Sequence, residues 1–526
     1  MSPPGQASSE LAIPKIKSLY AVTLDFYTNL LPKDPAAMGM RYSAAQIYFD
    51  YGHYTEAVKR FDGLATNFSS TKQGQGSART IVAYYNEKSD WANIVLYGKK
   101  FIANKELMAD LNIRKFIDDS LQTAMFNSAV AAEKARDHMK AADLFLEYQK
   151  MYPKNSNTDR AVNNAAVNFF KSGQVEKSIA AQKFLLKTYA KSALAPDVMA
   201  SMAETFEAIA QFQNAAETYS QFAGTYPSDK RAPVALYNAG VLFRGIKKLN
   251  LAAVSFANVY RKYPAHAAAN DALFESARLK EANHDNHGAI SDFELFWKNP
   301  ANQVKDNGIF AFAKSIELRL AGGSNSGGAL RDFSKLEAML LGKSAPAAPA
   351  ARRIVAKYLF EQQESNAKAF GAMSLNNGDR IEADAAAKQT KLVRLNTAYD
   401  RVLAIRNAEF SVATNYRLGE MHEGFATALF NAPAPAKSNQ KQIRDFKSQV
   451  EKAGFQLKED AIKFYETAYQ QSSEVETFTS WTQKTYQKMV QLAPQKHPAL
   501  DEMSANPSYM SLKVSMTEAT SSLSKD

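Results

Sequence analysis

An aromatic dipeptide recurs at a fixed interval in the first half of this 526-residue sequence, and it limits the folds open to the chain. Tyr152-Pro153, Tyr189-Ala190, Tyr226-Pro227 and Tyr263-Pro264 follow one another at 37, 37 and 37 residues. A period between about 20 and 50 residues is typical of stacked repeat architectures. A chain of this length also exceeds the size at which one hydrophobic core keeps growing. Both observations predict a stack of small repeated units.

Two further sets of residues keep the same interval and are mostly small. The second-helix small residues stand eleven residues before each dipeptide and continue the register on both sides: Ala57, Ile94, Ala141, Ser178, Ala215, Ala252 and Ala289. The first-helix small residues stand twelve residues earlier: Ala45, Val82, Ala129, Ala166, Ala203, Gly240 and Ala277. Four residues after the second-helix set come mostly aromatic residues: Phe61, Gly98, Phe145, Gln182, Tyr219, Phe256 and Phe293.

Helix periodicity explains these spacings, because residues four and seven apart lie on one helical face. Each repeat is predicted to be two helices whose backbones approach closely at the small residues, while the aromatic residue packs against the next repeat. Gly52, Gly173 and Gly245 fall between the two helices, where a turn needs φ above zero or a released helix end. The prolines of the dipeptides stop the second helix. About ten inserted residues, around 103 to 113, interrupt the register once.

This pattern resembles the consensus of the tetratricopeptide repeat (TPR), with its small residue, alanine, aromatic and helix-ending proline, stretched from 34 to 37 residues. The resemblance covers about residues 39 to 305 as seven repeats. Tyr20, Leu24, Tyr27 and Leu31-Pro32 continue it backwards as the second helix of a partial repeat.

The longer period and the Tyr-Pro ending are most similar to TPR proteins of Gram-negative cell envelopes, such as the Tol-Pal-associated coordinator of division and the lipoprotein of the β-barrel assembly machine. Two repeats depart from the pattern. The second has Ile94 and Gly98 where alanine and an aromatic are expected, and the seventh lacks the Tyr-Pro ending.

The predicted fold is all-α: a right-handed α-solenoid of TPR-like helix pairs with an irregular helical C-terminal region. Its expected parts are a disordered tether over 1–10, a repeat array of about seven and a half units over 11–306, a helical connector with Gly- and Pro-rich joints over 307–348, a C-terminal helical-repeat region over 349–500, and a mobile tail over 501–526. Residues 418–425, 461–468 and 492–494 are similar to TPR proteins associated with gliding motility in delta-proteobacteria.

Charge and cysteine content exclude several classes of function. The formal net charge is +11, but the basic residues are dispersed without a run of four, whereas a nucleic-acid interface needs them clustered on one face. The absence of cysteine rules out a disulfide framework, a thiolate nucleophile and a cysteine-based metal site. No apolar run approaches a membrane span, and the polar start lacks the apolar core of a signal peptide. A removed export signal and a cytosolic chain both fit that start.

Candidate catalytic and metal-binding residues are few. His284 and His287 flank an Asp-Asn pair, but they fall where the inter-helix turn of the seventh repeat belongs, so we interpret them as a solvated turn. The paired carboxylates Asp118-Asp119 and Glu382/Asp384 fall on polar helical faces. Nucleophile elbows, P-loops and GxGxxG fingerprints are absent from the sequence. We therefore expect no enzyme, no cofactor and no metal.

The TPR resemblance implies that the first helix of each pair lines a concave groove. Counting from the small-residue register places eight candidate binding residues there: Phe126, Asn163, Phe170, Glu204, Tyr237, Arg244, Phe274 and Arg278. Asn163, Arg244 and Arg278 suit a peptide backbone or carboxylate, and Phe126, Tyr237 and Phe274 suit apolar side chains. The alternative, that these residues are only solvated or pack between helices, stays open.

The expected function is a non-catalytic scaffold for protein or peptide partners, in the manner of an assembly or coordination factor of the bacterial cell envelope. The expected location is periplasmic or outer-membrane-associated, with membrane contact only through a removed N-terminal lipid anchor or a partner. A cytoplasmic TPR adaptor or chaperone is the alternative. A helical-repeat enzyme with an unrecognised site is a third interpretation.

Overall fold

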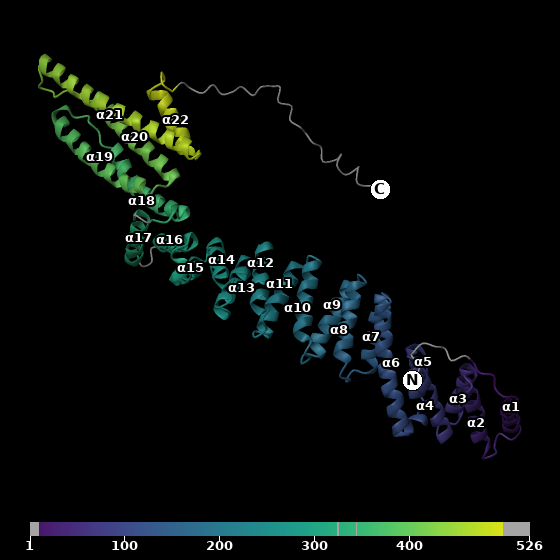
Figure 1. The fold of residues 1–526 in the computed structure, drawn as a ribbon. Coiled ribbons are helices and arrows are strands. Elements are labelled where there is room, and N and C mark those ends of the chain that lie inside the picture. Colours follow the sequence, from purple (N-terminus) through teal and green to yellow (C-terminus); the bar gives the residue numbers. More distant parts are fainter. Residues whose placement is uncertain (1–9, 323–325, 343–344, 498–526) are drawn as a thin grey trace, which may run out of the picture. The chain divides into compact units, whose positions relative to one another are not determined.

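The computed structural model describes residues 10–322, 326–342 and 345–497, and the regular secondary structure of this part of the chain is all helical (Figure 1). It contains 22 α-helices and three short 3-10 helices, and none of the residues described is in a strand. The chain divides into an N-terminal body, residues 1–266, and a C-terminal body, residues 267–526. The all-α prediction is confirmed. Residues 1–9 of the predicted tether and the predicted tail over 501–526 lie outside the described residues.

The N-terminal body begins with α1 (Lys15–Leu30), the second helix of the predicted partial repeat. Six helix pairs follow side by side (Figure 1): α2 (Ala37–Asp50) with α3 (Tyr54–Asn67), α4 (Lys72–Glu87) with α5 (Trp91–Ile102), α6 (Leu111–Lys134) with α7 (His138–Met151), α8 (Thr158–Lys171) with α9 (Val175–Thr188), α10 (Ala195–Ala208) with α11 (Phe212–Thr225), and α12 (Ala232–Gly245) with α13 (Leu249–Lys262). Each pair coincides with one predicted repeat. The inserted residues form η1 (Leu107–Ala109) and lengthen the start of α6.

The small residues of both registers are buried in every repeat, as the two-helix interpretation requires. Gly240 of α12 shows how closely the backbones approach, since a Cβ there would lie 2.8 Å from the ring of Phe256 on α13. The recurring tyrosine also has a structural role. The Tyr189 hydroxyl donates to the carbonyl oxygen of Pro153 at 3.0 Å, and the Tyr263 hydroxyl donates to that of Pro227 at 3.1 Å. Each of these bonds ties a repeat to the one before it.

The turn between the two helices of a repeat contains one residue in the left-handed region, five positions before the second-helix small residue. In the N-terminal body these residues are Gly52, Ser89, Arg136, Gly173, Ala210 and Lys247. The prediction that Gly52 and Gly173 serve this turn is confirmed. Gly245 fits only the second alternative, a helix end, because it is the last residue of α12 and the positive φ, +61°, belongs to Lys247.

Exchanging glycine and alanine at this turn position is expected to change stability in opposite directions. A residue with a Cβ pays roughly 1–2 kcal/mol in the left-handed region. A Cβ at Gly173 would meet no heavy atom within 4 Å, so Gly173→Ala is expected to lower the free energy of unfolding by about 1 kcal/mol through backbone strain alone. Ala210→Gly should raise it by a smaller amount, because glycine loses more conformational entropy on folding. Urea denaturation of both variants checks this, and a shift of the same sign in both would contradict it.

The C-terminal body begins with the seventh predicted helix pair and then leaves the 37-residue register. Its helices are α14 (Ala269–Ala282), α15 (Asn286–Lys298), η2 (Pro300–Asn302), α16 (Asp306–Ala321), α17 (Ser326–Leu341), α18 (Pro349–Gly371), η3 (Gly378–Arg380), α19 (Ile381–Ala404), α20 (Ala408–Phe430), α21 (Gln440–Glu474) and α22 (Ser480–Leu492). The helices α18 to α22 form a C-terminal bundle in which α20 packs against α18, α19, α21 and α22. Part of the predicted Gly-rich joint, residues 323–325, lies outside the described residues.

Candidate functional site

Three of the four aromatic candidates on the first helices, Phe126, Tyr237 and Phe274, are only half exposed. Phe126 packs edge-on against Phe145 with ring centroids 5.3 Å apart, and Tyr237 packs in the same way on Phe256 at 5.2 Å. In the C-terminal body, Phe274 lies 6.1 Å from Phe293. Each ring therefore packs between the two helices of its own pair and leaves only part of its surface accessible to a partner. The constant spacing of 19 residues between the two rings was a sequence signal for this contact.

The remaining candidates are mostly exposed. On the first helices of the N-terminal body, Phe170 is 44% exposed, Glu204 and Arg244 are exposed, and Asn163 is half-buried. In the C-terminal body, Arg278 is exposed and its Nη1 lies 3.4 Å from Oε1 of Glu275. The role of these eight residues in binding stays a prediction.

The predicted turn is only partly confirmed, because His284 lies in the turn whereas His287 is the second residue of α15. His284 is the left-handed residue of this turn, with φ of +60°. Asp285 is the N-cap of α15, where its Oδ1 accepts a hydrogen bond from the Gly288 amide at 2.9 Å. Throughout the described residues, no three His, Asp or Glu side chains are grouped closely enough to hold a metal ion. Among those same residues, no helix combines the length and apolar character that crossing a bilayer requires.

One segment of the N-terminal body matches a known family. Residues 123–155, which run from α6 through α7 to Tyr152-Pro153 and beyond, match the model of the tetratricopeptide repeat. This segment of the chain is therefore similar to a tetratricopeptide repeat. Arrays of this repeat generally form non-catalytic scaffolds that bind proteins.

Solved TPR structures resemble the chain at low sequence identity. They include a tetratricopeptide repeat protein from Parabacteroides merdae (12% identity, 54% of this chain and 99% of that chain, TM-score 0.24), the TPR domain of P58(IPK) (12%, 66% and 98%, TM-score 0.19) and a human IFIT1 dimer with PPP-AAAA (13%, 88% and 96%, TM-score 0.25). None of the curated protein sequences matches the chain.

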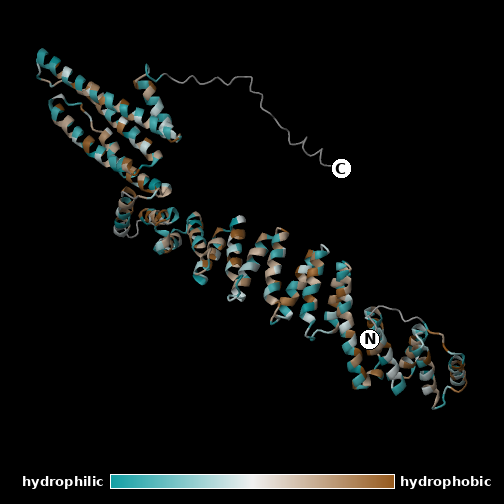
Figure 2. Cartoon of the chain, viewed as in Figure 1, coloured by the Kyte–Doolittle hydropathy of each residue, from teal (hydrophilic) through white to brown (hydrophobic). Residues whose placement is uncertain are grey.

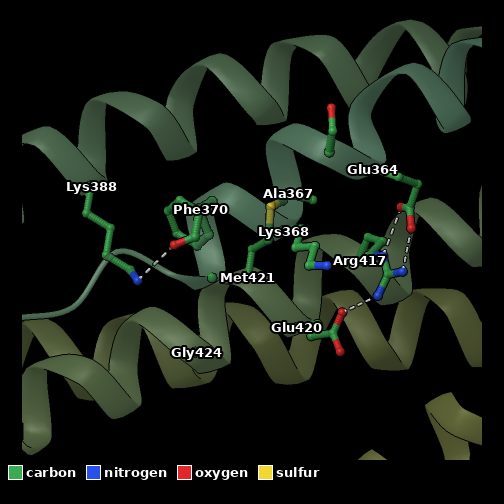
Figure 3. Close-up of a pocket in the computed structure, with 11 residues that line it drawn as sticks. Glu364, Ala367, Lys368, Phe370, Lys388, Arg417, Glu420, Met421 and Gly424 are labelled. Carbon is green, nitrogen blue, oxygen red and sulfur yellow. Dashed lines mark hydrogen bonds and ion pairs between the residues drawn. The ribbon is translucent and has the colours of Figure 1, made fainter.

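A cavity of about 680 Å³ lies within the C-terminal bundle, between α18, α19 and α20 (Figure 3). Arg417 of α20 lies at one end of it. Its guanidinium donates to Glu364 of α18 at 2.6 and 3.0 Å and to Glu420 at 2.5 Å. The hydrogen bonds to Glu364 are the main cause that raises the pKa of Arg417 above its usual range. The guanidinium is therefore paired with two carboxylates, and the three groups together carry one net negative charge.

Lys388 of α19 lies at the other end of the cavity (Figure 3) and is only 2% exposed. Its Nζ donates to the carbonyl oxygens of Met373 at 2.6 Å and Phe370 at 3.2 Å, just at the end of α18. The ammonium thus caps the negative end of this helix. None of the described carboxylates is within ion-pair distance of it. Burial removes the ammonium from water and so lowers the pKa of Lys388.

Sequence reasoning did not single out this cavity, although a signal for Lys388 was present. The buried stripe of α19 is apolar at Ile381, Leu392, Leu395, Tyr399 and Val402, and Lys388 occupies the same face. A lysine inside an apolar stripe is rarely buried without a polar partner. Its partners, the carbonyl groups at the end of α18, follow from tertiary packing and from no local pattern.

Proposed function

We propose that the chain is a non-catalytic scaffold for protein or peptide partners, acting as an assembly or coordination factor in the Gram-negative cell envelope. The observation that carries this proposal is that the repeats share their buried small residues but differ in their exposed residues. The small residues are buried in every repeat, while one exposed first-helix position changes from Phe170 to Glu207 to Arg244 in successive repeats. Such an array recognises an extended partner by presenting a different side chain at each step.

Exposed apolar residues on α1 also support a macromolecular partner. Ala21, Leu24 and Thr28 are buried where α1 packs on α2. Away from that contact, Ile16 is 78% exposed and Phe26 is 68% exposed, and Figure 2 shows hydrophobic residues along α1. Clustered exposed apolar side chains are typical of surfaces that contact another molecule.

Reversing the charge of Arg244 is expected to weaken partner recovery without unfolding the array. Arg244 is exposed on α12, so Arg244→Glu should leave the circular dichroism spectrum unchanged and reduce recovery in a crosslinking pull-down, more strongly at low salt than at high salt. Phe170→Ser in the same assay tests an apolar contact on α8. His287→Ala, in the turn region of the C-terminal body, is the control and should recover the same partners. If both first-helix variants behave like this control, the partner binds elsewhere.

Cell fractionation separates the envelope proposal from its alternative. The 37-residue period and the Tyr-Pro endings, which resemble those of TPR proteins of Gram-negative envelopes, support an envelope location. The native protein is therefore expected in the periplasmic or outer-membrane fraction, where protease added to spheroplasts degrades it. Recovery in the cytosol would instead support a cytoplasmic TPR adaptor or chaperone.

A further inference from the structure

Two glycines along the cavity of the C-terminal bundle have no packing role. Gly424 lies inside α20 and Gly371 ends α18, and a Cβ at either would meet no heavy atom within 4 Å. Gly419, one turn earlier on α20, differs, since a Cβ there would lie 2.8 Å from the ring of Tyr465. Glycine weakens a helix interior relative to alanine. At Gly419 close packing explains the glycine, whereas Gly424 lies beside open space along the cavity.

The lining of this cavity has an excess of positive charge. The charge of Arg417 is met by Glu364 and Glu420, whereas none of the described carboxylates forms an ion pair with Lys368 or Lys388. Lys368 is exposed and retains its hydration, but Lys388 is buried. A buried ammonium without a counter-ion is unfavourable. Two carbonyl oxygens and the rings of Phe370 and Phe425, whose centroids lie 4.6 and 5.8 Å from the Lys388 Nζ, compensate it only in part. A negative group placed in the cavity would supply the missing charge.

The cavity also has the size and the apolar surface of a small-molecule site. Such sites usually enclose about 300–1,000 Å³ and combine apolar walls with a few polar groups. Phe370 and Met421 contribute apolar walls between the two charged ends (Figure 3). We propose that the cavity binds an anionic amphipathic small molecule, whose carboxylate pairs with Lys388 and whose apolar chain lies against Phe370 and Met421.

Octanoate is a suitable probe, with octylamine as its cationic counterpart of equal chain length. Isothermal titration of the full chain is expected to show saturable binding of octanoate and at least tenfold weaker binding of octylamine. Lys388→Gln removes the charge but keeps a donor for the carbonyl groups of α18, and it should weaken octanoate binding at least tenfold. Gly424→Leu fills the open space and should weaken it to a similar extent without touching Lys388.

Gly224→Leu is the matched control, because Gly224 is an exposed helical glycine of the N-terminal body with nothing within 4 Å of its Cβ position. It should leave octanoate binding unchanged. Circular dichroism confirms that each variant is folded. Equal binding of octylamine and octanoate, octanoate binding that both bundle variants retain, or no saturable binding up to about 10 mM would overturn the proposal.

Discussion

Asp292→Ala is expected to destabilise the C-terminal body by about 3–5 kcal/mol. Asp292 lies on α15 and is 1% exposed. Its Oδ2 accepts from the Lys280 Nζ at 2.5 Å and from the Ser276 hydroxyl at 2.6 Å, both on α14. Removing the carboxylate leaves the mostly buried ammonium of Lys280 without its ion pair inside the helix pair.

The matched variants separate the charge from the hydrogen bond. Ser276→Ala removes one donor to the Asp292 carboxylate and should cost about 1.5–3 kcal/mol, the range for hydrogen bonds to charged groups. The double variant Lys280→Met with Asp292→Leu removes both charges and should recover most of the lost stability. Urea denaturation followed by circular dichroism measures all three proteins. A midpoint for Asp292→Ala close to that of Ser276→Ala would show that the buried ion pair contributes little.

The repeat array could be predicted in detail because its signal is repeated. Seven copies of one spacing place Ala141, Ala215 and Ala252 on the same helical face, and all three are fully buried. The turn between the helices could be predicted only in part. Its left-handed residue is glycine in two repeats but Arg136 or Lys247 in others, and those residue types carry no turn signal.

The helix on which each candidate binding residue lies could be predicted, but its exposure could not. The register placed Phe126 and Tyr237 on the first helices, yet their exposure depends on the aromatic ring that the second helix brings beside each of them. The cavity of the C-terminal bundle could not be predicted from the sequence. Lys388 and Arg417 line the same cavity because of the packing of α18, α19 and α20, where the 37-residue register no longer applies.

Gly240→Ala is expected to lower the free energy of unfolding by about 1–3 kcal/mol, although the substitution usually strengthens a helix. The added Cβ would lie 2.8–2.9 Å from three ring atoms of Phe256, which is fully buried and cannot swing into solvent. Gly245→Ala on the same helix is the control, because its Cβ position has nothing within 4 Å. It should be neutral or stabilising by up to about 1 kcal/mol.

The same contact connects the packing of the array to its candidate binding face. Phe256 has Gly240 on one side, and the ring of Tyr237 packs edge-on against it at 5.2 Å. A ring displaced by Gly240→Ala must therefore move Tyr237 or the α13 backbone, because protein interiors have little free volume. Adding Phe256→Leu should relieve the overpacking, so the two substitutions together should destabilise by less than the sum of their separate effects. Urea denaturation midpoints of the unmodified protein, the two single variants and the double variant measure this non-additivity. Strict additivity would mean that the backbones of α12 and α13 are not held at this separation by the small residue at position 240.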